Sequence, residues 1–155
     1  MKVSKTSTGI LLYRLVNHQI EYLLVHPGGP FWKNKDLGSW TIPKGEYEAP
    51  EIPIDAAIRE FKEETGIELS GTFISLKPIV QKGGKQVDAW ALEGDLDTAT
   101  IRSNTFEIEW PPKSGKRQVF PEIDKACWFS YDEAIEKINP AQINFIKELR
   151  HKLSI

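Results

Sequence analysis

The sequence has few cysteines, no long apolar run and no internal repeat. Its 155 residues include a single cysteine, Cys127, which excludes a disulfide framework and a cysteine-based zinc cluster. No apolar run approaches the ~20 residues that a membrane helix needs, and no internal repeat supports a collagen-like, coiled-coil or solenoid protein. The polar start at 1–6 does not have the pattern of a secretory leader. We therefore expect a cytoplasmic protein with no membrane partner.

The chain also lacks an excess of either charge. Lys and Arg number 20 against 22 Asp and Glu, a net charge of −2, which argues against a nucleic-acid binder held by bulk charge. The hydrophobic content of 40% and the small net charge exclude a disordered chain. The length suits one domain, and no stretch reads as a linker. We therefore expect a single domain over 1–155.

Apolar periodicity gives a coarse order of elements. We expect strands at 9–15, 20–26, 72–80, 86–92 and 126–129, a short strand at 105–110 inside a long polar stretch, and helices at 54–65, 131–138 and 141–153. Strands, then a helix, then more strands and helices predict a mixed sheet with helices on its faces. The fold class is therefore α/β.

The helix over 54–65 has the clearest signature. Its apolar residues fall at i, i+3, i+4 and i+7 and form one stripe, Ile54, Ala57, Ile58 and Phe61. Pro53 suits the start of a helix, and Gly66 suits the cap at its end. We expect the stripe to face the core.

Three acidic residues on this helix carry the chemistry. Glu60, Glu63 and Glu64 lie at i, i+3 and i+4, so they project from one face. An ordinary solvated helix face is the alternative interpretation. However, like charges at this spacing repel, and Glu63 and Glu64 occupy the last turn, where the helix dipole favours cations. A bound divalent cation would relieve both penalties, and oxygen ligands select hard ions such as Mg²⁺ or Mn²⁺.

At this point the residues resemble a known family. From Gly45 to Ile67 the sequence reads GEYEAPEIPIDAAIREFKEETGI, which is similar to the Nudix hydrolase signature Gly-x5-Glu-x7-Arg-Glu-U-x-Glu-Glu-x-Gly-U, where U is bulky and apolar. The nine specified positions are all matched, by Gly45, Glu51, Arg59, Glu60, Phe61, Glu63, Glu64, Gly66 and Ile67. The resemblance implies an α/β/α sandwich that hydrolyses a diphosphate linkage in a nucleoside diphosphate joined to another group.

The resemblance also implies roles for the residues of the motif. The glutamates matching Glu60, Glu63 and Glu64 hold divalent ions in the family, and one of them often activates water. The glycine matching Gly45 commonly supplies a carbonyl ligand. Arg59 would orient the glutamates, and Glu51 would fix the geometry between loop and helix. The catalytic residues expected are therefore Glu60, Glu63 and Arg59.

Several residues outside the motif are further candidates. Glu122 precedes the last strand, where Nudix proteins often bring an additional acid, so it is expected as a metal ligand; an ordinary loop acid is the alternative. Lys44, in a Pro-Lys-Gly sequence similar to family members acting on dinucleoside polyphosphates or capped RNA, would reach a phosphate chain, unless it is a plain surface lysine. Trp110 and Arg117 belong to a loop that could stack a base and hold phosphate, although such loops are usually just solvated. His26 is expected to be satisfied structurally or exposed rather than to contact substrate.

These observations lead to a ranked set of functions. The first is metal-dependent hydrolysis of a small nucleotide, with dinucleoside polyphosphates placed first because of Lys44. A MutT-like nucleoside triphosphate pyrophosphohydrolase is the alternative, and nucleotide sugars stay open. Nucleic acid is expected only as a capped RNA end. A non-catalytic module with the same fold that binds nucleotide or a protein partner represents a different class of function.

Overall fold

The computed structural model describes residues 6–154; most of the polar start, on which the expectation of no secretory leader depends, lies outside them. The described chain forms eight strands, β1 (Thr6–Val16), β2 (Gln19–Pro27), β3 (Lys44–Tyr47), β4 (Ile74–Val80), β5 (Gln86–Glu93), β6 (Thr105–Glu109), β7 (Arg117–Pro121) and β8 (Ile123–Phe129). Its helices are α1 (Pro53–Thr65), α2 (Tyr131–Lys137) and α3 (Ile143–Leu153), with 3₁₀ turns η1 (Thr98–Thr100) and η2 (Pro140–Gln142).

One mixed sheet organises these elements. Its strands follow the order β4-β5-β1-β2-β8, with β3 paired to β1. Strand β1 runs parallel to β5 and antiparallel to β2 and β3. The link between β1 and β2 is a tight turn at Asn17 and His18, both with positive φ, the geometry that matches the twist of a hairpin. The predicted mixed sheet is confirmed.

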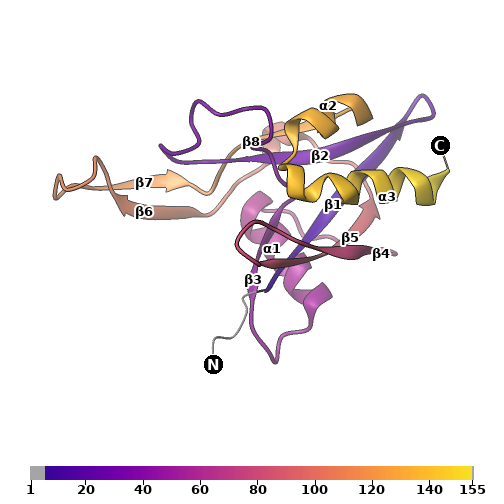
Figure 1. The fold of residues 1–155 in the computed structure, drawn as a ribbon, viewed down its shortest axis with the longest axis horizontal. Helices are drawn as coiled ribbons and strands as arrows, with labels where there is room; N and C mark the ends of the chain where they lie inside the picture. Colours follow the sequence, from indigo (N-terminus) through magenta and orange to yellow (C-terminus); the bar gives the residue numbers. More distant parts are fainter. Residues whose placement is uncertain (1–5, 155) are drawn as a thin grey trace.

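Helices cover both faces of this sheet (Figure 1). On one face, α1 buries Ala57 and Phe61 against Ile10, Leu12 and Leu23. The opposite face carries α2 and α3, whose buried residues include Ala134, Phe145, Ile146 and Leu149. Since α1 has 13 residues and α3 has 11, no helix of the described residues is long and apolar enough to cross a membrane. The expected α/β/α sandwich is therefore confirmed.

Helix α1 begins and ends where the sequence indicates. Pro53 is its first residue, and Gly66 closes it in the left-handed conformation at φ 81°, donating its amide to the Lys62 carbonyl. Of the predicted apolar stripe, Ala57 and Phe61 are fully buried while Ile54 and Ile58 are half-buried. The face beside the stripe is thus fixed, and it carries the glutamates.

The long polar stretch before β8 differs from expectation. Strand β6 was predicted, but its partner β7 and the turn η1 were not. Strands β6 and β7 form a separate hairpin that extends away from the body (Figure 1). Because most of β7 is exposed, its sequence lacks the apolar alternation that would reveal a strand. The strand expected at 126–129 also begins earlier, at Ile123.

A buried amide joins the elements around β3. Gln142 is fully buried; its Oε1 accepts from the Ile42 amide at 3.1 Å, and its Nε2 donates to Thr41 Oγ1 and Gln81 Oε1, both at 2.9 Å. The segment that leads into β3 is therefore tied to η2 and to the end of β4. This segment sets where Gly45 lies.

Replacing Gln142 by Leu should destabilise the protein by about 2–4 kcal/mol, because the change leaves buried donors and acceptors without partners. Urea denaturation of both proteins measures the difference. Gln19→Leu, at an exposed position, is the control and should stay within about 0.5 kcal/mol of the wild type. A similarly small effect for Gln142→Leu would contradict this account.

Candidate active site

The three glutamates of α1 lie at different depths. Glu64 is buried, with 9% of its surface exposed, whereas the side chains of Glu60 and Glu63 are 13% and 40% exposed. The cause is the helix register, since Glu64 follows Phe61 on the side that faces the sheet. The motif therefore presents one deep and two shallower carboxylates.

Arg59 holds the outer carboxylates in place. Its Nε and Nη2 donate to Glu51 at 2.7 and 2.9 Å, a two-point contact across the loop before α1. Its Nη1 donates to Glu60 at 2.9 Å and to Glu63 at 3.0 Å. A guanidinium provides this fixed fork of donors. The orienting roles expected of Arg59 and Glu51 agree with these contacts.

Strand β3 packs directly against the helix. A Cβ atom on Gly45 would lie 2.0 Å from Oε2 of Glu60, so only glycine allows the carboxylate to approach the β3 backbone so closely. Beside it, the Lys44 amide donates to Glu64 Oε1 at 3.2 Å. The pairing of β3 with β1 at Gly9 and Thr8 fixes this placement. Gly45, Glu60 and Glu64 are therefore brought together.

A chain of backbone hydrogen bonds positions Glu122 relative to α1. The Asn104 amide donates to the Glu63 carbonyl at 3.0 Å, and the Glu122 amide donates to the Asn104 carbonyl at 2.8 Å. From the other side, the Gly28 amide donates to the Glu122 carbonyl at 2.8 Å. A Cβ on Gly28 would lie 2.0 Å from the Pro121 oxygen, so this contact also requires glycine. The backbone therefore holds Glu122 near the end of the glutamate helix.

Gly28 and Asn104 are site-forming residues that the sequence analysis did not identify. Gly28 belongs to the segment Pro27-Gly28-Gly29-Pro30, which follows the strand expected at 20–26. Its consecutive glycines were a signal of close backbone approach. Asn104 acts through its backbone, which leaves no mark in the sequence.

The carboxylates interact electrostatically. Burial raises the pKa of Glu64 to about 8, with the charges of Glu60 and Glu122 adding to the effect. Burial and the charge of Glu63 raise the pKa values of Glu60 and Glu122. In contrast, the Arg59 contacts lower the pKa of Glu51. The carboxyl groups of Glu60, Glu63, Glu64 and Glu122 therefore interact electrostatically. Arg59 offsets only part of their negative charge.

These donors suit a hard divalent cation. Glu60 and Glu64, whose pKa values are raised, place carboxylate oxygens beside the backbone at Gly45. Mg²⁺ and Mn²⁺ prefer oxygen ligands. Among residues 6–154 no three acidic, histidine or cysteine side chains already converge as a metal cluster. Instead, Glu60 and Glu63 share Arg59. An ion would compete with this arginine for the same oxygens.

The remaining candidates are distributed around this centre. Lys44 is half-buried, and its ammonium senses the charges of Glu64, Glu46 and Glu60, while burial lowers its pKa. Trp110 follows β6 and packs edge-on against Phe31, with 5.3 Å between ring centroids. Arg117 is 61% exposed and pairs with Glu107 at 2.5 Å. Lys44 is thus part of the glutamate centre, while Trp110 and Arg117 lie on the hairpin.

His26 is buried and fully paired. Its Nδ1 lies 2.7 Å from Asp124 Oδ1, and its Nε2 lies 2.6 Å from the Lys35 carbonyl. These contacts join the end of β2, the loop after it and β8. The structural role expected for His26 agrees with this placement.

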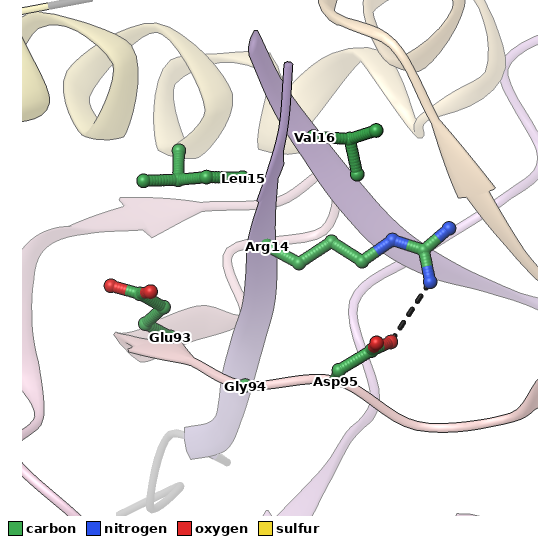
Figure 2. Close-up of a pocket in the computed structure, with 6 residues that line it drawn as sticks. All are labelled: Arg14, Leu15, Val16, Glu93, Gly94 and Asp95. Atoms are coloured by element: carbon green, nitrogen blue, oxygen red, sulfur yellow. Dashed lines mark hydrogen bonds and ion pairs between the residues drawn. The ribbon is translucent and has the colours of Figure 1, made fainter. Parts of the chain in front are cut away.

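A separate hollow lies at the far end of β1 (Figure 2). Arg14 points into it but pairs with Asp95 and Glu21, both at 2.8 Å, and lies over the Trp128 ring. Arg14 is five residues along β1 from Gly9, roughly 16 Å at the usual strand rise. With its charge already paired and the glutamates distant, this hollow does not belong to the site.

The fold and the site together define an α/β/α protein with a carboxylate centre built on one helix. The chain belongs to the NUDIX family, because the NUDIX domain model matches residues 5–149.

Parts of the chain are also similar to proteins of known name. The chain is 32% identical over 89 residues to a rat bis(5'-nucleosyl)-tetraphosphatase (asymmetrical), covering 54% of this chain and 56% of the relative. It is 31% identical over 101 residues to a Myxococcus xanthus octanoyltransferase, covering 65% of this chain and 25% of the relative. The chain thus spans about half or less of these relatives. A C. elegans Ap4A hydrolase structure aligns with TM-score 0.64 and 24% identity, covering 97% of this chain and 98% of that one, which supports the fold.

The raised pKa of Glu64 predicts how stability depends on pH without metal. Between pH 4.5 and about 8 the folded protein keeps a proton that an unfolded chain has lost, so stability falls as pH rises through this window. Glu64→Gln, which mimics the protonated acid, should raise Tm at pH 8.5 by on the order of 5 °C and change it little at pH 4.5.

Calorimetry in EDTA measures this effect, and Glu68→Gln, at a 74% exposed side chain, is the matched control. Adding Mg²⁺ should stabilise the wild type more than Glu64→Gln. A variant that is less stable than the wild type at pH 8.5 would contradict the assigned electrostatics.

Proposed function

We propose that this protein hydrolyses a pyrophosphate linkage in a nucleoside diphosphate derivative and that the reaction depends on Mg²⁺. One observation carries the proposal: the carboxyl groups of Glu60, Glu63, Glu64 and Glu122 influence one another electrostatically beside a glycine that lets Glu60 approach the backbone of β3. Acidic groups clustered in this way destabilise the folded protein unless a bound cation offsets their charge, which is typical of a functional site. Membership of the NUDIX family supports the same activity.

The residues have distinct tasks in this reaction. Glu60, Glu63, Glu64 and Glu122, with the Gly45 carbonyl, would hold Mg²⁺ (or Mn²⁺). When bound, the ion neutralises phosphate charge and makes water more acidic. Glu60 or Glu63 accepts the proton of the attacking water, and Arg59 holds both carboxylates in position. Catalysis then depends mainly on positioning and charge.

A dinucleoside polyphosphate is our first choice of substrate. Lys44 lies beside Glu60 and Glu64, so its ammonium can contact a phosphate chain held at the same centre. The similarity to the rat bis(5'-nucleosyl)-tetraphosphatase favours the same class of substrate. Trp110 and Arg117 are proposed as more distant substrate contacts.

Replacing Glu63 by Gln should lower turnover by about 10²-fold or more, because the change removes a charged ligand and a possible proton acceptor. Initial rates at saturating Mg²⁺ provide the measurement. Glu68→Gln, just beyond the helix and exposed, should keep wild-type turnover. Full activity in both Glu63→Gln and Glu64→Gln would overturn the assignment of the site.

A substrate panel tests the ranking. It contains a diadenosine polyphosphate, a deoxynucleoside triphosphate, a nucleotide sugar and a capped oligonucleotide, each with Mg²⁺ or with EDTA. We expect Mg²⁺-dependent cleavage, fastest for the diadenosine polyphosphate. A large preference for the triphosphate would favour a MutT-like activity. Tight nucleotide binding without cleavage would instead indicate a non-catalytic module.

A further inference from the structure

A second cleft begins beside Glu122. It lies between the loop after β2 and the β6–β7 hairpin, and its volume is about 570 Å³, within the roughly 300–1,000 Å³ typical of ligand pockets. The lining residues are Gly29, Pro30, Lys33, Trp110, Gln118, Phe120, Pro121 and Asp124. Since Pro121 precedes Glu122 directly, the cleft opens next to the glutamate centre.

One face of the hairpin supplies the aromatic wall of this cleft. Residues paired across the hairpin share a face, so Phe106 and Phe120 lie together with Ile108 and Gln118. Arg117, one residue along from Gln118, points to the opposite face and pairs with Glu107. Because side chains alternate between the two faces of a strand, the rings of Phe106 and Phe120 face the loop after β2, and the ion pair of Arg117 with Glu107 lies on the opposite face.

The loop side is fixed against the hairpin. A Cβ on Gly29 would lie 2.7 Å from the Phe106 ring, and Phe31 meets Trp110 edge-on at an interplanar angle of 77°. His26 links Asp124 to the Lys35 carbonyl. The cleft is therefore held by contacts on both walls.

Polar groups at the edge of the cleft are available to a ligand. Lys33 makes no ion pair or side-chain hydrogen bond with the described residues. Asp124 uses Oδ1 for His26, and Gln118 uses Nε2 for the Trp110 carbonyl at 2.9 Å. Asp124 Oδ2 and Gln118 Oε1 remain as acceptors. An aromatic ring, two acceptors and a cation are the groups that recognise a base with amino hydrogens and an attached phosphate.

We propose that this cleft binds the purine base of the nucleotide whose phosphates lie at the glutamates. Trp110 stacks on the base, Asp124 and Gln118 accept from its exocyclic amino group, and Lys33 contacts the nearest phosphate. An indole offers a larger overlap to a purine than to a pyrimidine. The proposal rests on the proposed function for where the phosphates lie, but base binding itself needs no hydrolysis.

Binding of adenosine 5'-monophosphate in EDTA tests the cleft separately from catalysis. We expect Trp110→Ala to weaken binding by about tenfold or more, since stacking on an aromatic side chain contributes ~1–3 kcal/mol per base. Trp110→Phe should retain most of the affinity. Trp32→Ala is the matched control, because Trp32 lies in the loop after β2, with Lys35 over its ring, and does not line the cleft. NMR titration provides the affinities and shows through indole signals which tryptophan meets the base.

Further binding experiments distinguish recognition of the base from recognition of the phosphate. Lys33→Ala should weaken binding of adenosine monophosphate several-fold and leave adenosine unchanged, whereas Lys35→Ala should affect neither. Cytidine monophosphate and ribose 5-phosphate should bind more weakly than the purine nucleotide. Wild-type affinity in folded Trp110→Ala would overturn the proposal, as would cytidine monophosphate that binds as tightly as adenosine monophosphate. A catalytically inactive protein that still shows this pattern would refute only the proposed hydrolysis.

Discussion

Repulsion among four carboxylates is the constraint on which the rest of the site depends. Glu60, Glu63 and Glu64 cannot separate, because helix α1 fixes their spacing, and Glu64 is largely shielded from water, because its face of the helix meets the sheet. The protein opposes this repulsion with one arginine, one backbone amide from Lys44 and the close approach at Gly45. Each device orients an oxygen without neutralising it fully. A centre built in this way remains available to a divalent cation.

The same constraint explains why loops far from α1 in the sequence are connected to it by backbone hydrogen bonds. Glu122 lies outside the helix, so its position relative to Glu63 requires a connection, which the backbone of Asn104 provides. Gly28 braces the other side of Glu122, where no side chain would fit. Loops that carry functional groups are usually positioned by a scaffold. Here the loop after β2 and the segment before β8 form that scaffold together.

The sequence predicts those residues whose role depends on the identity of the side chain, and it does not predict those that act through backbone atoms or through contacts between distant segments. The nine positions of the motif and the periodicity of α1 identified the glutamates, because side-chain identity at fixed helical spacing carries that information. Strand β7 was missed because it is exposed and belongs to a separate two-stranded sheet. Gly28 and Asn104 were missed because they act through backbone atoms. The base cleft depends on two segments about 80 residues apart meeting across Gly29 and Phe106, a contact that local patterns do not encode.

The two halves of the site also divide chemistry from recognition. The glutamate centre depends on residues that the family motif specifies, whereas the cleft depends on a hairpin and a loop outside the motif. Changes on the hairpin can therefore alter which base is held without altering the charge that activates water. Glu122 lies where the two halves meet, since Pro121 lines the cleft and the Glu122 amide is tied through Asn104 to α1. A shift of the hairpin would consequently reach the catalytic centre through Asn104 and Glu122 at its two ends, which couples the choice of ligand to the geometry of the reaction.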